Sequence, residues 1–416
     1  MKISDIRPQI FALADEAEKA IKPQLELIDS VARKNTMKVM QAFQDNRVSE
    51  SCFAGTTGYG YDDLGRETLD KVYAQVFGAE KALVRISFVN GTHALSAALY
   101  ALLKPGDTLL SVTGLPYDTL RNAIGIEGDY HGSMRFYGIN YGQVDLLPGG
   151  DPDLDGIKAA CRDESVTAVL IQRSRGYGNR RALSVKEIGD ICVAVKSVRA
   201  DINVMVDNCY GEFTEETEPT QVGADLMAGS LIKNPGGGLA PAGGYIAGRE
   251  ELVDRAAQRL TTPGIGGECG ASLGNNRLMF QGFFMAPHTV AQALKTAVFC
   301  AAMMEKTGFE TSPASGDTRH DIIQMITLRS EENMKRFCRG IQSGAPVDSY
   351  VTPEPWQMPG YSCPVIMAAG AFIQGSSIEL SADGPVKEPY TVYMQGGLTY
   401  ESGRLGIMNA VNEILT

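Results

Sequence analysis

The sequence predicts an α/β fold, in which a mainly parallel sheet with helices on both faces is followed by a smaller α+β domain. Short apolar segments alternate with helical patterns from residue 82 to residue 248, which favours right-handed crossovers between parallel strands. Such a sheet is covered on both faces by its crossover helices. The chain has 416 residues, of which 44% are hydrophobic. This length suffices for two or three domains with apolar cores.

Helices are predicted at the N-terminus and before the sheet. Apolar residues at helical spacing, such as Ile10, Leu13 and Ala17, predict one or two helices within 8–46. The loop FAGTTGYGYDDLG, rich in glycine and aromatic residues, separates them from a helix predicted over 66–78. The elements of the sheet then follow along the chain. Strands are predicted at 82–89, 108–114, 168–174, 203–208, 226–232 and 243–248, and helices at 92–103, around 154–161 and at 185–198.

A second, smaller domain is predicted at the C-terminus. A helix over 288–305 leads out of the sheet domain, and GFETSPASGDTRHD has the composition of a boundary loop. Beyond it we expect a helix at 330–342 and strands near 370–381 and 390–395. The predicted division of the chain is therefore an N-terminal helical segment and arm (1–60), a large domain (61–290) and a small domain (291–416).

The composition argues against several classes of partner. The net charge of −11 leaves no basic excess for the phosphates of a nucleic acid or an anionic membrane. No apolar stretch reaches the length of a membrane span, and the charged N-terminus lacks the apolar core of a signal peptide. The eight cysteines include no CxxC motif and are expected to be reduced, as in a cytoplasmic protein. The four histidines are too dispersed for a zinc site, so no metal is expected.

One motif with chemical potential is FVNGTHALSAALYALL, where a predicted strand leads through Asn90, Gly91 and Thr92 into a helix. The first amides of a helix have no internal partner and lie at the positive end of its dipole, so they can bind phosphate. Gly91 would let a ligand approach the backbone closely. The alternative is an ordinary strand–turn–helix in which Thr92 is the cap.

Two further motifs place an acid and a lysine at strand ends. In NVMVDNCYGE, Asp207 ends an apolar strand, where it caps a turn or faces a protonated ring nitrogen. In SLIKNPGGG, Lys233 follows the next strand, three residues after Ser230. The carboxyl ends of parallel strands are the edge at which such sheets bind ligands.

A lysine, an acid and an anion-binding helix start are the groups that pyridoxal phosphate requires. The lysine amine forms a Schiff base with the aldehyde, the acid keeps the pyridine nitrogen protonated, and helix amides hold the phosphate. The proline and glycines after Lys233 would end the strand and leave room for the cofactor. The alternative for Lys233 is a surface lysine before a glycine loop.

Taken together, these motifs resemble a known family. NGTHA, VDN and SLIKN occur in the order found in fold-type I pyridoxal-phosphate enzymes, and the sequence is similar to the Cys/Met metabolism enzymes, namely cystathionine β- and γ-lyases and methionine γ-lyase. TGYGYDDLGRETLDKVYAQVFGAEKALVR, VLIQRSRGY and LIKNPGGGLAPAGGYIAG are similar to the cystathionine β-lyase-like branch called aluminium resistance proteins. The resemblance covers residues 10–416. It implies the aspartate-aminotransferase-like fold of pyridoxal-phosphate-dependent transferases, with a seven-stranded sheet.

The resemblance also implies roles for the motif residues. Lys233 would be the Schiff-base lysine and general base, and Asp207 the partner of the pyridine nitrogen. Gly91 and Thr92 would hold the cofactor phosphate through backbone amides, and Ser230 would add a hydroxyl.

Further roles come from residues outside these motifs. Tyr117 would stack on the cofactor ring, with His93 as the alternative. In the family a tyrosine from the neighbouring subunit meets the phosphate, and Tyr59 and Tyr61 are the matching candidates, which implies a homodimer or homotetramer. Arg404, in the predicted small domain, would bind the substrate carboxylate.

The implied activity is that of a carbon–sulfur lyase acting on a sulfur-containing amino acid, by β-elimination as in cystathionine β-lyases or γ-elimination as in methionine γ-lyases. The SxxTKY pattern typical of the family is SLIKNP here, so which of these reactions is retained stays open. The alternatives are an aminotransferase or aldolase, since the same cofactor site serves all of them, and a regulatory protein that binds pyridoxal phosphate without catalysis.

Two short motifs point to other enzyme classes and are rejected on context. Ser230–Lys233 is formally SxxK, 306–308 is KTG and 177–179 is YxN, a set that mimics penicillin-binding enzymes. YxN precedes SxxK, however, and a helix breaker follows Lys233 where that family needs a helix. GASLG at 270–274 matches GxSxG, but no predicted strand precedes it.

Overall fold

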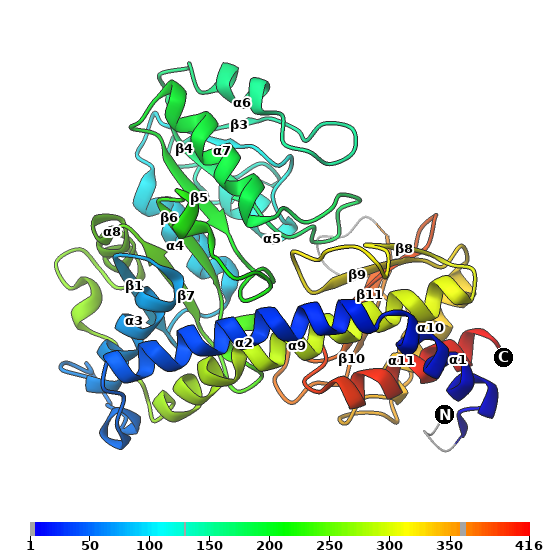
Figure 1. Cartoon of the computed structure of the whole chain (residues 1–416). Helices are drawn as coiled ribbons and strands as arrows, with labels where there is room; N and C mark the ends of the chain where they lie inside the picture. The colour runs from blue at the N-terminus through cyan, green and yellow to red at the C-terminus, as the bar shows by residue number, and fades with distance from the viewer. Residues whose placement is uncertain (1–4, 129, 358–362) are drawn as a thin grey trace.

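The computed structural model describes residues 5–128, 130–357 and 363–416 and contains two sheets joined by one long helix (Figure 1). The predicted seven-stranded, mainly parallel sheet is confirmed. Its strand order is β1-β7-β6-β5-β4-β2-β3, and β7 alone runs antiparallel to its neighbours. The strands are β1 (Lys81–Arg85), β2 (Thr108–Ser111), β3 (Asn140–Gln143), β4 (Val166–Gln172), β5 (Asn203–Asp207), β6 (Leu226–Ser230) and β7 (Gly244–Gly248).

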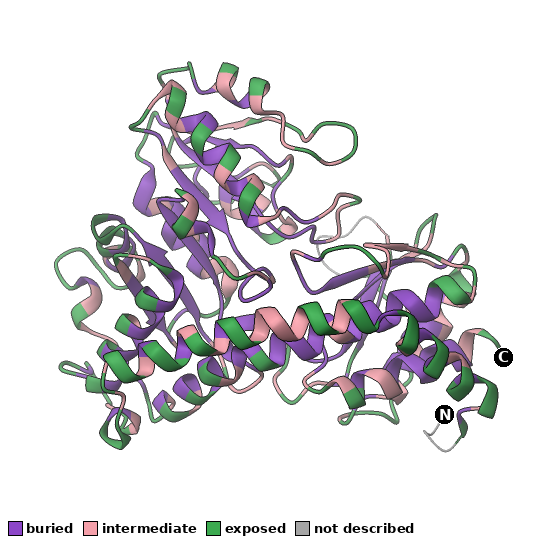
Figure 2. Ribbon diagram, viewed as in Figure 1, coloured by how far each residue is buried: buried purple, intermediate pink, exposed green. Residues whose placement is uncertain are grey.

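Helices cover both faces of this sheet because its strands carry apolar side chains on both sides (Figure 2). One face packs against α4 (Gly91–Leu102), α5 (Asp118–Ile124) and α8 (Glu250–Leu260). The opposite face packs against the remaining large helices. These are α2 (Lys22–Asp45), α3 (Leu64–Phe77), α6 (Leu154–Ala160), α7 (Val185–Val198) and the first half of α9 (Asn276–Lys306).

The second sheet is antiparallel, with the order β10-β11-β12-β9-β8. Its core is shared with α1 (Pro8–Ala20), α10 (Glu331–Ser343), α11 (Tyr400–Ile414) and the second half of α9. The sheet lies at the far end of α9 from the large sheet (Figure 1). Its strands are β8 (Glu310–Ser312), β9 (Ile323–Thr327), β10 (Val365–Ala369), β11 (Ser381–Pro385) and β12 (Thr391–Gln395).

Several predicted boundaries need correction. The strand predicted at 82–89 ends at Arg85, and residues 86–90 form the connection to α4. The helix predicted at 288–305 is the second half of α9, which spans both cores. Residues 370–380 of the strand predicted at 370–381 form the loop between β10 and β11, and the strand itself begins at Ser381. The division of the chain at residues 60 and 290 stays a prediction, and residues 1–4 of its first segment lie outside the described residues.

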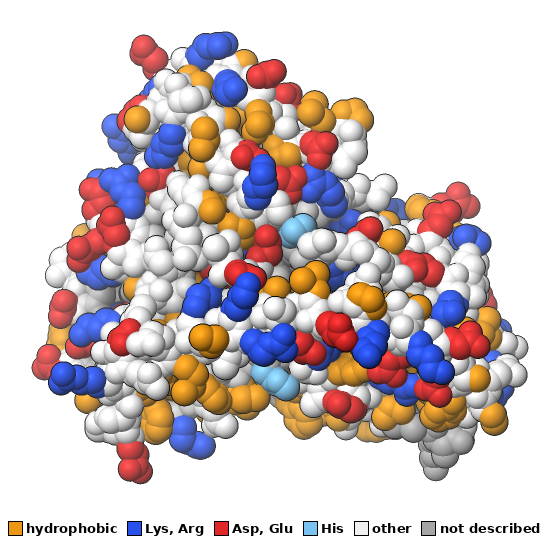
Figure 3. Space-filling view, in the orientation of Figure 1, with side chains coloured by type: hydrophobic (Ala, Val, Ile, Leu, Met, Phe, Trp, Pro, Cys, Tyr) orange, Lys and Arg blue, Asp and Glu red, His pale blue; other side chains and the backbone are white. Residues whose placement is uncertain are grey.

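The surface carries charges of both signs. Figure 3 shows basic and acidic side chains interspersed over the face that includes α2. Within the described part of the chain, no helix combines the length and apolar character needed to cross a bilayer. Nor does that part bring together three or more His, Cys, Asp or Glu side chains in a metal-binding arrangement.

The glycines after Lys233 are required by close packing. β6 and β7 form an antiparallel hairpin whose loop, 231–243, carries the lysine. A Cβ atom on Gly236 would lie 1.8 Å from the Leu231 carbonyl oxygen. One on Gly237, whose φ is +56°, would lie 2.2 Å from the Gly282 carbonyl oxygen in α9. The loop therefore folds tightly on itself and against α9, which fixes the backbone around Lys233.

Replacing Gly236 should therefore destabilise the protein. In Gly236→Ala the new methyl group meets backbone atoms that cannot rotate away, and we expect the midpoint of thermal unfolding to fall by about 3 °C or more. Gly316→Ala is the matched control, because a Cβ there would meet only the end of Gln24 at 3.9 Å. Differential scanning calorimetry of both variants checks this, and equal midpoints would contradict it.

Candidate active site

Lys233 lines a cavity of about 210 Å³ at the carboxyl ends of β5 and β6. Most of the residues predicted from the motifs meet there. β5 contributes Asp207, β6 contributes Ser230, and the start of α4 contributes the backbone of the phosphate motif. The predicted residues that line the cavity are Gly91, Thr92, Tyr117, Asp207, Ser230 and Lys233.

The start of α4 forms one end of this cavity. Asn90 is the cap residue, and its side chain accepts a hydrogen bond from the His93 amide at 2.9 Å. The amides of Gly91 and Thr92 come before this point and have no acceptor within the helix. A Cβ atom on Gly91 would lie 3.0 Å from the Cβ of Ser230, so glycine allows the helix start to approach β6. The first two amides of α4 and the Ser230 side chain therefore lie close together at one end of the cavity.

Asp207 is the buried acid of the cavity. It is the last residue of β5, and its Oδ1 accepts a hydrogen bond from the Cys209 amide at 3.1 Å. Burial raises the pKa of the Asp207 carboxyl, and the nearby positive charge of Lys233 opposes this. The charges of the acid and the lysine therefore attract one another in the cavity.

Lys233 contacts a residue that the motifs did not single out. Its Nζ lies 3.9 Å from the centre of the Tyr210 ring. Burial by itself lowers the pKa of Lys233, but Cys209, Tyr210, Tyr117 and Asp207 together raise it above its usual value. Tyr210 follows Asp207 by three residues in VDNCYGE, and its place in the same turn is the only sequence signal that it has.

Of the two candidates for the stacking ring, the structure brings Tyr117 to the cavity and not His93. Tyr117 precedes α5 and lines the cavity. The His93 Nδ1 instead accepts a hydrogen bond from the Val89 amide at 3.2 Å, and the ring packs edge-on against Phe88. His93 therefore lies in the first turn of α4, outside the residues that line the cavity.

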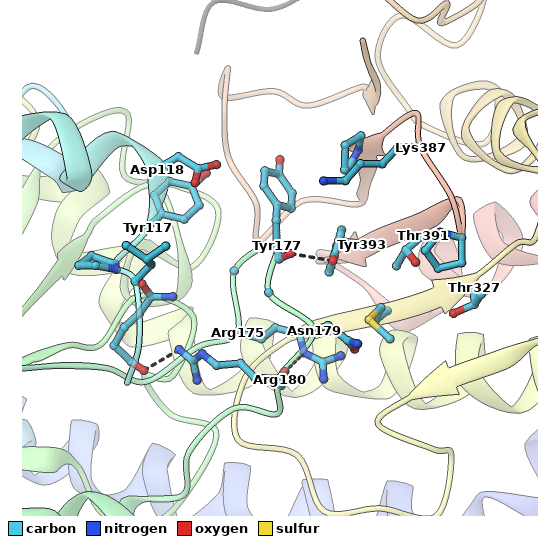
Figure 4. A pocket seen from close by; sticks show the side chains of 18 of the residues that line it. Tyr117, Asp118, Arg175, Tyr177, Asn179, Arg180, Thr327, Lys387, Thr391 and Tyr393 are labelled. Carbon is cyan, nitrogen blue, oxygen red and sulfur yellow. Dashed lines mark hydrogen bonds between the residues drawn. The ribbon is translucent and has the colours of Figure 1, made fainter. Parts of the chain in front are cut away.

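A larger cleft of about 840 Å³ adjoins the cavity, sharing Tyr117, Gln172 and Gly176 with it. Its walls come from the loop after β4 and from the strands of the second sheet (Figure 4). The Tyr393 hydroxyl on β12 donates to the backbone oxygen of Tyr177 at 2.8 Å and so joins the two walls. The opening of the cavity therefore lies between the two sheets.

Two arginines from the loop after β4, Arg175 and Arg180, line this cleft. The Nη atoms of Arg180 donate to nearby backbone oxygens, including that of Gln172 at the end of β4 at 2.7 Å. Arg175 is buried and donates from Nε to the Arg180 oxygen and from its Nη atoms to Ser312. A guanidinium has five N–H groups, so these three bonds leave two N–H groups for a further acceptor. Among the described residues, no carboxylate accepts a hydrogen bond from the Arg175 guanidinium.

The prediction for Arg404 needs correction. Arg404 lies on α11 and forms ion pairs with Asp15 at 2.8 Å and Glu18 at 3.3 Å, both on α1. It lines neither the cavity nor the cleft. These ion pairs link α11 to α1.

Tyr59 and Tyr61 lie outside the cavity of their own chain. They occupy the loop before α3, with 71% and 55% of their surfaces exposed, and their rings stack at 5.7 Å between centres.

The comparison with protein families decides the relationship of this chain. A family model described as methionine gamma-lyase matches residues 10–415. The chain belongs to the methionine gamma-lyase family. The resemblance predicted from NGTHA, VDN and SLIKN is thereby confirmed.

Individual relatives of this chain show two levels of similarity. The uncharacterized protein YnbB of Bacillus subtilis (strain 168) is 48% identical over 403 residues, covering 97% of this chain and 96% of YnbB. The L-methionine gamma-lyase of Pseudomonas putida is 27% identical over 210 residues, covering 49% of this chain and 47% of that enzyme.

Solved structures give the same relationship. A carbon–sulfur lyase involved in aluminum resistance from Clostridium novyi NT superposes with a TM-score of 0.95 at 52% identity, covering 98% of this chain and 96% of that chain. A more distant structure, the pyridoxal-5'-phosphate dependent protein YhfS from Escherichia coli, has a TM-score of 0.62 at 18% identity, covering 92% of this chain and 96% of that chain. The second likeness shows a shared fold only.

Proposed function

We propose that the chain is a pyridoxal-phosphate-dependent carbon–sulfur lyase with the aspartate-aminotransferase-like fold, acting on a sulfur-containing amino acid. The observation that carries the proposal is the meeting of Lys233, Asp207 and the start of α4 in one cavity. Membership of the methionine gamma-lyase family supports it, as does the 52% identity to a carbon–sulfur lyase. The alternatives weighed from the sequence receive no such support.

The residues of the cavity fit this cofactor. The amides of Gly91 and Thr92 and the hydroxyl of Ser230 would hold the phosphate, because they line the same cavity and a side chain on residue 91 would crowd Ser230. Asp207 would face the ring nitrogen, and Tyr117 would lie against the ring. Pyridoxal phosphate supplies a protonated ring that withdraws electrons from the substrate Cα.

Residues of this chain would carry out the proton transfer. Lys233 Nζ would be the base that takes the substrate Cα proton. The Asp207 carboxylate would lie beside the ring nitrogen and favour its protonated form. The products expected of this reaction are a thiol and, after hydrolysis, a keto acid and ammonia.

We propose that Arg175, in place of Arg404, binds the substrate carboxylate. Arg175 lines the adjoining cleft, and two of its N–H groups are left for a further acceptor. In Arg175→Gln we expect KM to rise by about 10- to 100-fold, the effect of losing one charged hydrogen-bond partner. Arg404→Gln is the control, and its KM should stay within about twofold because only contacts to α1 are lost. Steady-state kinetics on both variants checks this, and the opposite pattern would restore Arg404 as the anchor.

The active unit is proposed to be a homodimer or homotetramer in which Tyr59 and Tyr61 reach the phosphate of a neighbouring subunit. Mixing inactive Lys233→Ala subunits with Tyr59→Ala/Tyr61→Ala subunits should then restore activity. Each mixed dimer has one complete site, so an equal mixture should reach about a quarter of wild-type activity. No recovery after subunit exchange, verified by native mass spectrometry, would mean that each chain builds its own site.

The function is tested by absorption spectroscopy and product assays. Purified protein reconstituted with pyridoxal phosphate should show a visible band that borohydride abolishes. L-cystathionine and L-methionine are then added separately, and thiol and ammonia are assayed. Release of both products supports the lyase. A coloured protein that converts substrate to keto acid without releasing ammonia would instead be an aminotransferase, and one that cannot bind the cofactor would refute the proposal.

A further inference from the structure

Tyr210 has an uncommon backbone conformation next to the lysine. Its φ is +72°, in the left-handed region that bulky residues rarely adopt. Strain of this kind persists only where the surrounding structure enforces it, and it clusters at functional sites. The ring lines the cavity and lies 3.9 Å below Lys233 Nζ, measured to the ring centre.

The turn from Asp207 to Gly211 enforces this conformation. The Asn208 amide donates to the Ala228 oxygen at 3.0 Å, and the Gly211 amide donates back to the Asn208 oxygen at 2.9 Å. A Cβ atom on Gly211 would lie 2.5 Å from the Cδ of the buried Arg173, so the chain cannot swing outward there. The same short turn therefore presents both the acid and the aromatic ring to the cavity.

The Tyr210 ring is placed to act on the proton that Lys233 carries, because its face lies against the amine. Titratable groups near the amine are Asp207, Cys209 and Tyr210 from the turn and Tyr117 from the start of α5, with Glu212 buried behind the turn. Asp207 is engaged with the ring nitrogen in the proposed function. After Lys233 has taken the Cα proton it is a cation that Asp207 attracts, and an aromatic face beside the amine stabilises this cation further.

We propose that Tyr210 is a positioning residue that holds the ammonium form of Lys233 on its ring face whenever this amine is not bonded to the cofactor. The role in catalysis rests on the proposed function, whereas the contact between the ring and the amine is a feature of the structure. It assigns the effect to the ring face and not to the hydroxyl group. Removing the ring must therefore lower the pKa of Lys233, while removing the hydroxyl must not.

The test measures the pKa of the Lys233 amine in cofactor-free protein. Brief labelling with acetic anhydride at a series of pH values, read by mass spectrometry of the peptide, gives the titration curve of this amine. Tyr210→Phe keeps the ring and should match the wild type. Tyr210→Leu should shift the curve down by about one pH unit, so that Lys233 is labelled about tenfold faster below its pKa.

A comparison of phenylalanine with pentafluorophenylalanine at position 210 distinguishes the effect of the ring face from a folding defect in Tyr210→Leu. Pentafluorophenylalanine at position 210 has the shape of phenylalanine but a reversed charge distribution on the ring face, so it should shift the curve like leucine. Superimposable curves for phenylalanine and pentafluorophenylalanine would overturn the proposal, as would an equal shift in Tyr210→Phe and Tyr210→Leu.

The readout separates this inference from the proposed function. Labelling needs no cofactor and no substrate, so it reports the ring–amine contact even if the lyase assay fails. In the loaded enzyme, Tyr210→Leu should lower kcat about tenfold with little change in KM, because the ring acts after substrate binding. A change confined to KM would overturn the role assigned to Tyr210.

Discussion

Lys233→Ala should fold like the wild type and lose essentially all lyase activity, with kcat lower by more than about 10³-fold. The variant lacks both the amine that bonds to the cofactor and the base that takes the Cα proton. It should also lack the visible band that borohydride abolishes. The loss follows from the position of the lysine in the loop just after β6, because no other amine lines the cavity among the described residues.

A matched control separates this loss from a general effect of removing a lysine. Lys186 lies on α7 with 83% of its side chain exposed and pairs only with Asp190, so Lys186→Ala should keep full activity. Mass mapping after borohydride reduction should find the pyridoxyl group on the peptide that contains residue 233. Steady-state turnover by Lys233→Ala, or a pyridoxyl group on another lysine, would refute the assignment.

Asp207→Asn should lower kcat by about 10²- to 10³-fold, the cost of removing one preorganised charge from a buried site. An amide of the same shape can still accept the hydrogen bond from the Cys209 amide, so the turn should survive. It cannot supply the negative charge that keeps the ring nitrogen protonated. The visible band should therefore persist, and its dependence on pH should change.

Glu212→Gln is the control for Asp207→Asn, because Glu212 is also buried but does not line the cavity. The Tyr245 hydroxyl donates to Glu212 Oε1 at 2.8 Å, and burial raises the pKa of the Glu212 carboxyl to about 8. Replacing it with glutamine should leave kcat within a few-fold of the wild type. Single-turnover absorbance measurements compare the two variants directly, and a wild-type rate in Asp207→Asn would refute the role of the acid.

The alternation of strands and helices was predictable because each element buries an apolar face. The helix expected over 185–198 is α7 with the same bounds, since Ser184 caps it and apolar residues recur at helical spacing. The direction of β7 could not be predicted, because an apolar segment looks the same in either direction. β3 was missed because NYGQ lies at the edge of the sheet and is only partly buried.

The site was predictable where a side chain follows directly from a strand end, as for Asp207 and Ser230. The place of Tyr210 in the cavity was not predicted, because nothing in VDNCYGE indicates that this tyrosine adopts a left-handed backbone conformation. Arg175 was missed because the loop after β4 meets the second sheet only in the folded chain. Arg404 was misplaced for the same reason, since the packing of α11 against α1 is a long-range contact.

The hairpin that carries Lys233 limits how this protein can evolve. β6 and β7 pair residue by residue from Leu226 with Gly248 to Ser230 with Gly244, so a one-residue deletion in either strand would turn its side chains to the opposite face. Insertions and deletions should therefore be absent between residues 203 and 248 in active relatives. They should collect in exposed connections such as 145–152, where the backbone holds no part of the site.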